Sequence, residues 1–237
     1  AFELDIPCAD DNLVKERSVY AEHLIRYIFG TFNSYDNSQL SNPFTDNGSF
    51  VINVCEEYGY GKTSFFALLY NKLTTQWNNQ YIAFCYRPWM CENENSMVNE
   101  FFNIFREELS SYNPQINKNI TNYIRTLLDK SNNILVHFVR TIFCQSSSMQ
   151  EERQKLKEAI VRIGKPIIVF IDDVDRLQKE ELLFLLKLVR DTADFQNVFY
   201  IMAADKNHIS SSLRDCNISN PNNYLKKIMT GILFFIY

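Results

Sequence analysis

The stretch "INVCEEYGYGKTSFF" (Ile52–Phe66) decides the fold of this chain. A short apolar, β-branched run starting at Ser49 leads into it, and helical spacing of apolar side chains follows from Lys62 to about Leu73. This pattern predicts a buried strand, a glycine-containing loop and a helix. In that order, successive backbone amides and the positive end of the helix surround an anion, so we expect a phosphate-binding loop.

The loop matches the pattern GxxxxGK(S/T) at every defined place except the first. Glycines keep its wrapping part free of side chains, Lys62 can reach the β and γ phosphates, and Thr63 can hold magnesium. A turn followed by an ordinary helix cap is the alternative that this stretch leaves open. The residues that we expect to contact the nucleotide are Glu57, Tyr58, Gly59, Tyr60, Gly61, Lys62, Thr63 and Ser64.

The first glycine of the pattern is replaced by Glu56. A carboxylate that faced the phosphates in a partly desolvated site would repel them. An ordinary residue is tolerated at this place if its backbone angles suit it and its side chain points away. We therefore expect nucleotide binding to be weakened rather than abolished.

A second half of the site is expected at the end of "KPIIVFIDD" (Lys165–Asp173), the most hydrophobic run in the chain. A run without alternation is typical of a strand that is buried on both faces of a parallel sheet. Two carboxylates at the tip of such a neighbouring strand are costly unless they face a cation or solvent. We expect Asp172 to hold magnesium and Asp173 to orient or deprotonate the attacking water, while Lys62 serves catalysis by neutralising charge on the phosphates.

Further apolar runs alternate with helical patterns along the chain. This alternation predicts a three-layer α/β fold with a mainly parallel sheet and right-handed crossovers. The other expected strands are Tyr81–Trp89, Asn197–Asp205 and Gly231–Tyr237, and the other expected helices are Leu13–Phe32, Asn95–Tyr112, about 116–157 in broken form, and 178–195.

Motifs along nearly the whole chain resemble those of the KAP family of P-loop NTPases. The matching stretches are "DIPCADDNLVKER" (Asp5–Arg17), "EEYGYGKT" (Glu56–Thr63), "YRPW" (Tyr86–Trp89), "IDDVDRL" (Ile171–Leu177), "NVFYIMAADKNHI" (Asn197–Ile209) and "YLKKI" (Tyr224–Ile228). The resemblance implies an additional-strand ATPase fold, ATP and Mg²⁺ as ligands, and a switch that works in signalling or phage-defence complexes. The departures from the family pattern are Glu56, Tyr58 and Arg87.

Several residues near the two half-motifs leave alternatives open. The resemblance puts Asp205 where related ATPases place a sensor of the γ-phosphate, and an N-cap for the following helix fits equally well. Asp175 and Arg176 either face a neighbouring subunit's nucleotide or form a local ion pair. Trp89, like Tyr86, is expected to pack at the edge of the core rather than stack on adenine.

Bulk properties exclude several classes of protein. The net charge is −4 and the charges of both signs are mixed, which disfavours direct binding of nucleic acid. The six cysteines form no CxxC pair, so we expect no zinc site and a reducing, cytoplasmic setting. The opening "AFELDIPCADD" lacks the features of a signal peptide, and the apolar runs are too short to span a bilayer. Peripheral association with a membrane stays open.

The chain of 237 residues is long enough for one domain, which we expect to cover residues 1–237. It ends where an ATPase of this class continues into a helical lid, so we expect a lidless domain, truncated at its C-terminus, with poor turnover. The leading hypothesis is a slow, Mg²⁺-dependent ATP hydrolase that acts as a switch with protein partners or as a homo-oligomer. The alternative is a nucleotide-binding interaction module that does not hydrolyse ATP. No motif decides between ATP and GTP.

Overall fold

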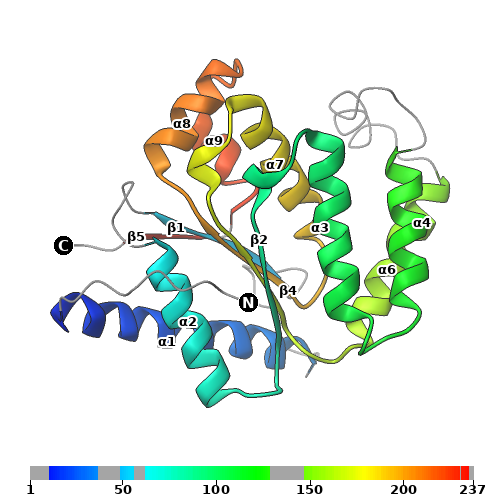
Figure 1. The fold of residues 1–237 in the computed structure, drawn as a ribbon, viewed down its shortest axis with the longest axis horizontal. Helices are drawn as coiled ribbons and strands as arrows, with labels where there is room; N and C mark the ends of the chain where they lie inside the picture. Colours follow the sequence, from blue (N-terminus) through cyan, green and yellow to red (C-terminus); the bar gives the residue numbers. More distant parts are fainter. Residues whose placement is uncertain (1–10, 37–48, 56–61, 129–146, 230, 235–237) are drawn as a thin grey trace.

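The structure is a computed structural model that describes residues 11–36, 49–55, 62–128, 147–229 and 231–234. In this part of the chain a five-stranded sheet has the strand order β2-β3-β4-β1-β5 (Figure 1). All neighbouring strands are parallel, which confirms the predicted α/β class. The strands are β1 (Phe50–Cys55), β2 (Ile82–Tyr86), β3 (Ile167–Ile171), β4 (Val198–Ala203) and β5 (Gly231–Phe234).

Helices connect the strands and cover both faces of the sheet (Figure 1). The broken helical region expected at 116–157 contains α4 and α6, and the residues between these helices lie outside the described ranges. The helices are α1 (Asp11–Asp36), α2 (Lys62–Gln76), α3 (Glu94–Leu109), α4 (Ile116–Leu128), α6 (Ser147–Val161), α7 (Lys179–Thr192), α8 (Lys206–Asp215) and α9 (Pro221–Leu225). Two short 3₁₀ turns are η1 (Pro88–Met90) and η2 (Val174–Arg176).

The strand order corrects one expectation about the site. The residue pattern predicted the acidic strand as a neighbour of the strand before the loop, whereas the resemblance implied an extra strand between them, and β4 does lie between β1 and β3. All six residues of β4 are buried, and it pairs with β1 at Phe199 and with β3 at Val198. A wholly apolar strand is most stable in the middle of a parallel sheet, and β4 is the additional strand that the resemblance implied.

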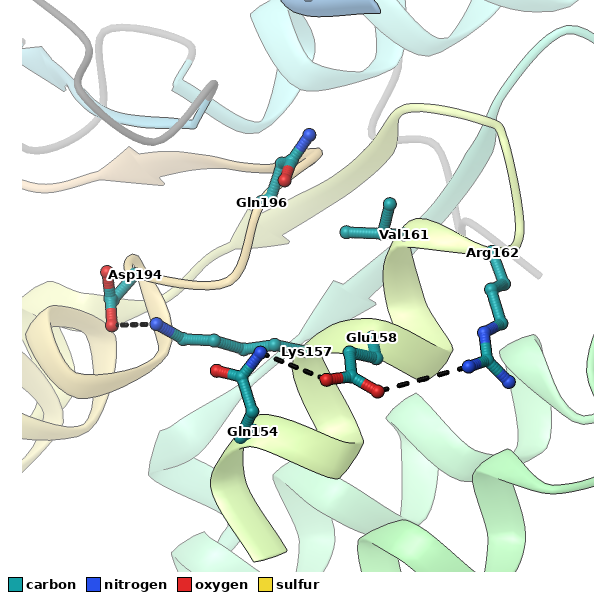
Figure 2. A pocket seen from close by; sticks show the side chains of 7 residues that line it. All are labelled: Gln154, Lys157, Glu158, Val161, Arg162, Asp194 and Gln196. Atoms are coloured by element: carbon teal, nitrogen blue, oxygen red, sulfur yellow. Dashed lines mark hydrogen bonds and ion pairs between the residues drawn. The ribbon is translucent and has the colours of Figure 1, made fainter. Parts of the chain in front are cut away.

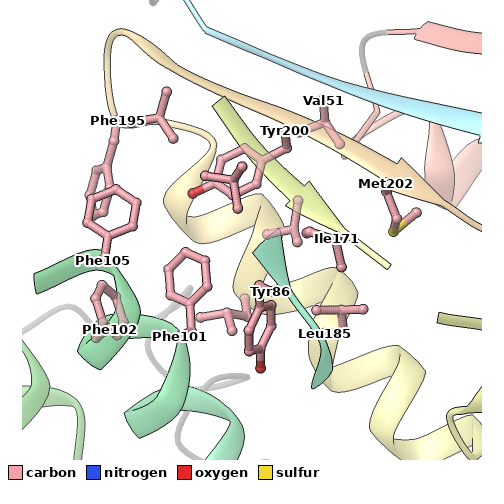
Figure 3. Packing of buried hydrophobic residues seen from close by; sticks show 14 of the residues in the cluster. Val51, Tyr86, Phe101, Phe102, Phe105, Ile171, Leu185, Phe195, Tyr200 and Met202 are labelled. Atoms are coloured by element: carbon pink, nitrogen blue, oxygen red, sulfur yellow. The ribbon is translucent and has the colours of Figure 1, made fainter. Parts of the chain in front are cut away.

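Two hydrophobic layers hold the helices against the sheet. On one face, apolar side chains of α1 and α2 pack against β1, β3 and β4. On the other face, α3 and α7 cover the sheet, and α4 and α6 lie outside α3. Aromatic rings fill this second layer (Figure 3): Phe101 of α3 lies 5.3 Å from Tyr86 and 6.4 Å from Tyr200, measured between ring centroids. Packing on both faces therefore holds the sheet, and with it the carboxyl ends of the strands, in place.

Candidate functional site

Three chain segments reach the same edge of the sheet, where the parallel strands have their carboxyl ends. β1 ends at Cys55 and α2 begins at Lys62, while β3 is followed by Asp172 and Asp173. The third segment leaves β4 and reaches Asp205 just before α8. In open α/β sheets, ligands bind at this edge.

The two half-motifs meet through Thr63 and Asp172. The Thr63 hydroxyl Oγ1 donates a hydrogen bond to Asp172 Oδ2 at 3.2 Å. Asp172 is 5% exposed, and among the described residues no cation lies within ion-pair distance of it. A hydroxyl oxygen and a carboxylate oxygen therefore lie side by side, and oxygen donors of this kind are the ligands that Mg²⁺ prefers.

The environment of Asp172 makes its charge costly. Burial raises the pKa of its carboxyl group above the ordinary value, and the neighbouring charge of Asp173 raises it further. The backbone N–H of Asp173, which donates to Asp172 Oδ1 at 2.9 Å, works in the opposite direction, as does the positive charge of Arg87. A divalent cation at this carboxylate would relieve the cost of burial.

Lys62, the lysine of the loop pattern, contacts an acid that is not one of the two predicted carboxylates. Its Nζ lies 2.7 Å from Oδ2 of Asp175, and both side chains are only 11% exposed. The other oxygen of Asp175 accepts a hydrogen bond from the backbone N–H of Asp205 at 2.7 Å. Asp175 therefore links the lysine at the start of α2 to the end of β4.

Asp173 is held from two sides. Its Oδ2 accepts a hydrogen bond from Nε1 of Trp89 at 3.0 Å, and its Oδ1 lies 2.9 Å from Nε of Arg176. The Arg176 guanidinium also stacks on the Trp89 ring, 4.7 Å from the centroid. Arg176 therefore forms a local ion pair, as one alternative had it, but with Asp173 and not with Asp175, which pairs with the distant Lys62.

Asp205 caps α8. Its side chain accepts a hydrogen bond from the backbone N–H of Asn207 at 2.6 Å, as an N-cap residue does. The structure thus contains the N-cap that we gave as one alternative. A role for Asp205 in sensing the γ-phosphate stays a prediction.

A comparison with known families decides what this arrangement is. A family model described as the KAP family P-loop domain matches residues 17–232. The chain belongs to the KAP family. A search of curated proteins finds no match to the chain. The match confirms the resemblance drawn from the motifs, and it makes this a P-loop domain of a nucleotide-binding family.

The structure places only some of the predicted contact residues of the KAP domain. Lys62, Thr63 and Ser64 form the first turn of α2, all three partly buried. The part of the loop from 56 to 61 lies outside the described residues, so the expected contacts of the loop and the effect of the glutamate stay predictions. The predicted loop residues in that part are Glu56, Glu57, Tyr58, Gly59, Tyr60 and Gly61.

Sequence reasoning placed Trp89 wrongly and missed Asn53. Tyr86 is fully buried as expected, but Trp89 is 40% exposed and contacts Asp173 instead of the core. Asn53 lies inside β1, is 1% exposed, and donates through Nδ2 to the carbonyl of Ala204 at 3.3 Å. The signal that could have identified Asn53 is a single polar residue within an apolar strand, because a buried amide needs hydrogen-bond partners.

A pocket at the opposite edge of the sheet offers a contrast (Figure 2). Its charged side chains are occupied with one another: Lys157 with Asp194, and Glu158 with Gln154 and Arg162. These residues belong to α6 and to the turn before β4, so they lie at the amino ends of β3 and β4.

No helix among the described residues is both long and apolar enough to cross a membrane.

Proposed function

We propose that this KAP domain binds ATP with Mg²⁺ at the carboxyl edge of the sheet and hydrolyses it slowly as a switch. The observation that carries the proposal is the contact between Thr63 and Asp172, which joins the helix after the loop to the acidic strand. Lys62 lies at the start of the same helix and supplies the positive charge that phosphates need.

Nucleotide binding requires Lys62 to change partner. In the structure its amine faces Asp175 at 2.7 Å. A triphosphate carries more negative charge than one carboxylate, so it can draw the amine away from Asp175. Asp175 then keeps the hydrogen bond from Asp205, which connects the phosphate side of the site to the start of α8.

The residues present fit a magnesium ion. No group of three His, Cys, Asp or Glu side chains among the described residues forms a metal site of its own. Mg²⁺ usually takes one or two protein oxygens and completes its shell with water and phosphate oxygens. Thr63 and Asp172 would hold it, and when bound it would neutralise charge on the transferring phosphoryl group.

Asp173 is the residue that we propose to orient the attacking water. The water oxygen forms a bond to the γ-phosphorus while the bond from phosphorus to the β–γ bridging oxygen breaks, and its electron pair stays on ADP. One proton of the water passes to the Asp173 carboxylate. Lys62 stabilises the negative charge that develops on the phosphate oxygens.

A second candidate function is a nucleotide-binding module that does not turn over. Both oxygens of Asp173 already have a partner, a hydrogen bond from Trp89 and an ion pair with Arg176, which favours an acid held at rest. In that case nucleotide binding would organise an assembly with a protein partner or with a second copy.

Calorimetry with ATP and Mg²⁺, followed by a phosphate-release assay, separates the two functions. Binding with slow release of phosphate supports the hydrolysing switch. Binding without release selects the module, and no binding contradicts both.

We further propose a cytoplasmic setting, supported by the free thiols of the described cysteines Cys55, Cys85, Cys91 and Cys216.

A further inference from the structure

We propose that Trp89 and Arg176 form a clamp that fixes the direction of the Asp173 carboxylate for hydrolysis. The clamp consists of the indole of Trp89, the guanidinium of Arg176 and the carboxylate between them. Trp89 and Arg176 are positioning residues, because they act on the reaction through Asp173. The inference rests on the proposed function, in which Asp173 orients the attacking water.

The three side chains of the clamp contact one another in a closed triangle. Trp89 Nε1 donates a hydrogen bond to Oδ2 of Asp173 at 3.0 Å, and Arg176 Nε forms an ion pair with Oδ1 at 2.9 Å. Arg176 lies over the Trp89 ring at 4.7 Å, within the range of a cation–π contact. Each member thus has two partners, and the carboxylate cannot turn without losing its contact with Trp89 or with Arg176.

The backbone at Asp173 shows that its position is imposed by its surroundings. Its φ of 58° lies in the left-handed region, which costs an L-residue about 1 kcal/mol. The carbonyl of Asp173 accepts from the N–H of Arg176 at 3.2 Å and closes the turn η2. Aspartate tolerates this conformation better than most residues, and a strained backbone at the tip of a buried strand is common at functional sites.

The sheet brings the partners of the clamp together from distant parts of the chain. Tyr86 at the end of β2 pairs with Ile171 at the end of β3, so the segments after them leave the sheet side by side. Pro88 begins η1, and this turn contacts η2. Trp89 is 40% exposed and hydrogen-bonded to Asp173, so it does not occupy the position of a core residue.

The clamp leaves Asp173 able to act. An ionised carboxylate offers about four lone-pair positions, and Trp89 and Arg176 each engage one of its oxygens, so positions on both oxygens remain open. The remaining positions can accept a proton from water, and the clamp limits the directions in which they point. Without the clamp the carboxylate rotates freely, so fewer encounters place the water in line with the phosphorus.

The variant Trp89→Phe tests the clamp, because it removes the N–H donor and keeps an aromatic ring beneath Arg176. We expect kcat for ATP hydrolysis to fall about tenfold while KM stays within about twofold, since the donor acts on the base and not on nucleotide binding. The matched control is Trp77→Phe. Trp77 is the other of the two tryptophans, and it stacks on Phe29 at 4.0 Å near the end of α2. The control should leave both constants unchanged.

A second readout needs no nucleotide. The indole N–H groups of Trp89 and Trp77 give two NMR signals, which the two Phe variants assign. We expect Asp173→Ala to shift the Trp89 signal and leave the Trp77 signal in place. Arg176→Lys, which keeps the charge but loses the planar stack, should shift the Trp89 signal and lower kcat by a smaller factor than Trp89→Phe.

The outcomes separate the clamp from the proposed function. A wild-type protein that hydrolyses ATP while Trp89→Phe turns over as fast as Trp77→Phe overturns the clamp and leaves the function standing. A wild-type protein that releases no phosphate overturns hydrolysis, and the clamp with it as a device for hydrolysis. A Trp89 signal that does not respond to Asp173→Ala overturns the clamp in either case. A fall in kcat at constant KM, with the shifted signal, supports it.

Discussion

Two lysine–aspartate pairs lie at opposite edges of the same sheet and have opposite surroundings. Lys62 and Asp175 meet at the carboxyl edge, and Lys157 and Asp194 meet at the amino edge (Figure 2). At the amino edge Asp194 also faces Arg153, at 3.3 Å. There one acid is shared by two cations, so α6 is tied to the turn before β4.

The balance of charge is reversed at the carboxyl edge. Three acids follow β3 within four residues, Asp172, Asp173 and Asp175, and the cations that pair with them are Lys62 and Arg176. Asp172 lies buried with the hydroxyl of Thr63 and no paired cation among the described residues. At the amino edge two cations share one acid, so the ion pairs there stabilise the structure. At the carboxyl edge three acids face two paired cations, which favours the binding of a divalent cation.

Replacing the two lysines should separate the two edges most strongly. We expect Lys62→Met to weaken ATP binding by about 10- to 100-fold, because charge-assisted hydrogen bonds to phosphate contribute about 1.5–3 kcal/mol. Lys157→Met should leave ATP affinity unchanged. Calorimetry on both variants checks this, and equal affinities for the two would contradict the assignment of the nucleotide site to the carboxyl edge.

Removing Asp175, the acid that pairs with Lys62, should strengthen ATP binding instead of weakening it. Asp175→Asn keeps an oxygen that can accept from the Asp205 N–H but removes the charge that competes with phosphate. We expect ATP to bind about fivefold more tightly, which corresponds to about 1 kcal/mol for a partly buried ion pair. Asp194→Asn is the matched control and should not change ATP affinity. Weaker binding by Asp175→Asn would mean that Asp175 supports the nucleotide instead of competing with it.

The pH dependence of the free energy of unfolding should reveal how much the buried charge of Asp172 destabilises the folded chain. Burial raises the pKa of its carboxyl group in the folded chain above the ordinary value of 3.8. As pH rises through 3.8, the unfolded chain releases the proton first, so the free energy of unfolding falls with pH until the folded group also ionises. At pH above both pKa values the wild type carries the full cost.

The variant Asp172→Asn should remove that cost. Its melting temperature without nucleotide should therefore exceed that of the wild type at neutral pH, by about 2–4 °C for each kcal/mol relieved in a chain of this length. The advantage should shrink as the pH is lowered towards 4. Scanning calorimetry across this range measures it, and a variant that melts below the wild type at neutral pH would show that Asp172 is stabilised rather than strained.

The smallest effect is expected at the amino edge. Asp194→Asn takes a partner from Lys157 and Arg153, whose side chains are partly exposed, so the loss should be about 0.5–1 kcal/mol. The melting temperature at neutral pH should fall by about 1–4 °C. An increase in stability would remove the contrast between the two edges.

The sequence predicted the strands well because their burial is extreme. The run Ile167–Ile171 is wholly apolar and wholly buried, and such a strand has few alternatives to the centre of a sheet. The meeting of Thr63 with Asp172 also followed from the pattern, since parallel strands bring their carboxyl ends to one edge. The strand β4 was also predicted from its apolar run, and only its place between β1 and β3 came from the resemblance.

The partners of the charged groups were beyond the sequence. Trp89 contacts Asp173 only because β2 and β3 pair with Tyr86 opposite Ile171, and a local pattern does not fix the register of strands so far apart in the chain. The left-handed backbone of Asp173 then sets the direction of the turn, so that Asp175 faces Lys62 while Arg176 turns back.

The central claim is that Lys62 and Asp172 act on one triphosphate with its metal ion. Calorimetric titration of ATP into the wild type and Asp172→Asn, each with excess Mg²⁺ and with EDTA, tests this most directly. The account predicts that Mg²⁺ tightens ATP binding in the wild type, and that Asp172→Asn loses this gain while its affinity without Mg²⁺ is equal or higher. A variant that keeps the full gain from Mg²⁺, or a wild type that binds no ATP, would contradict the account.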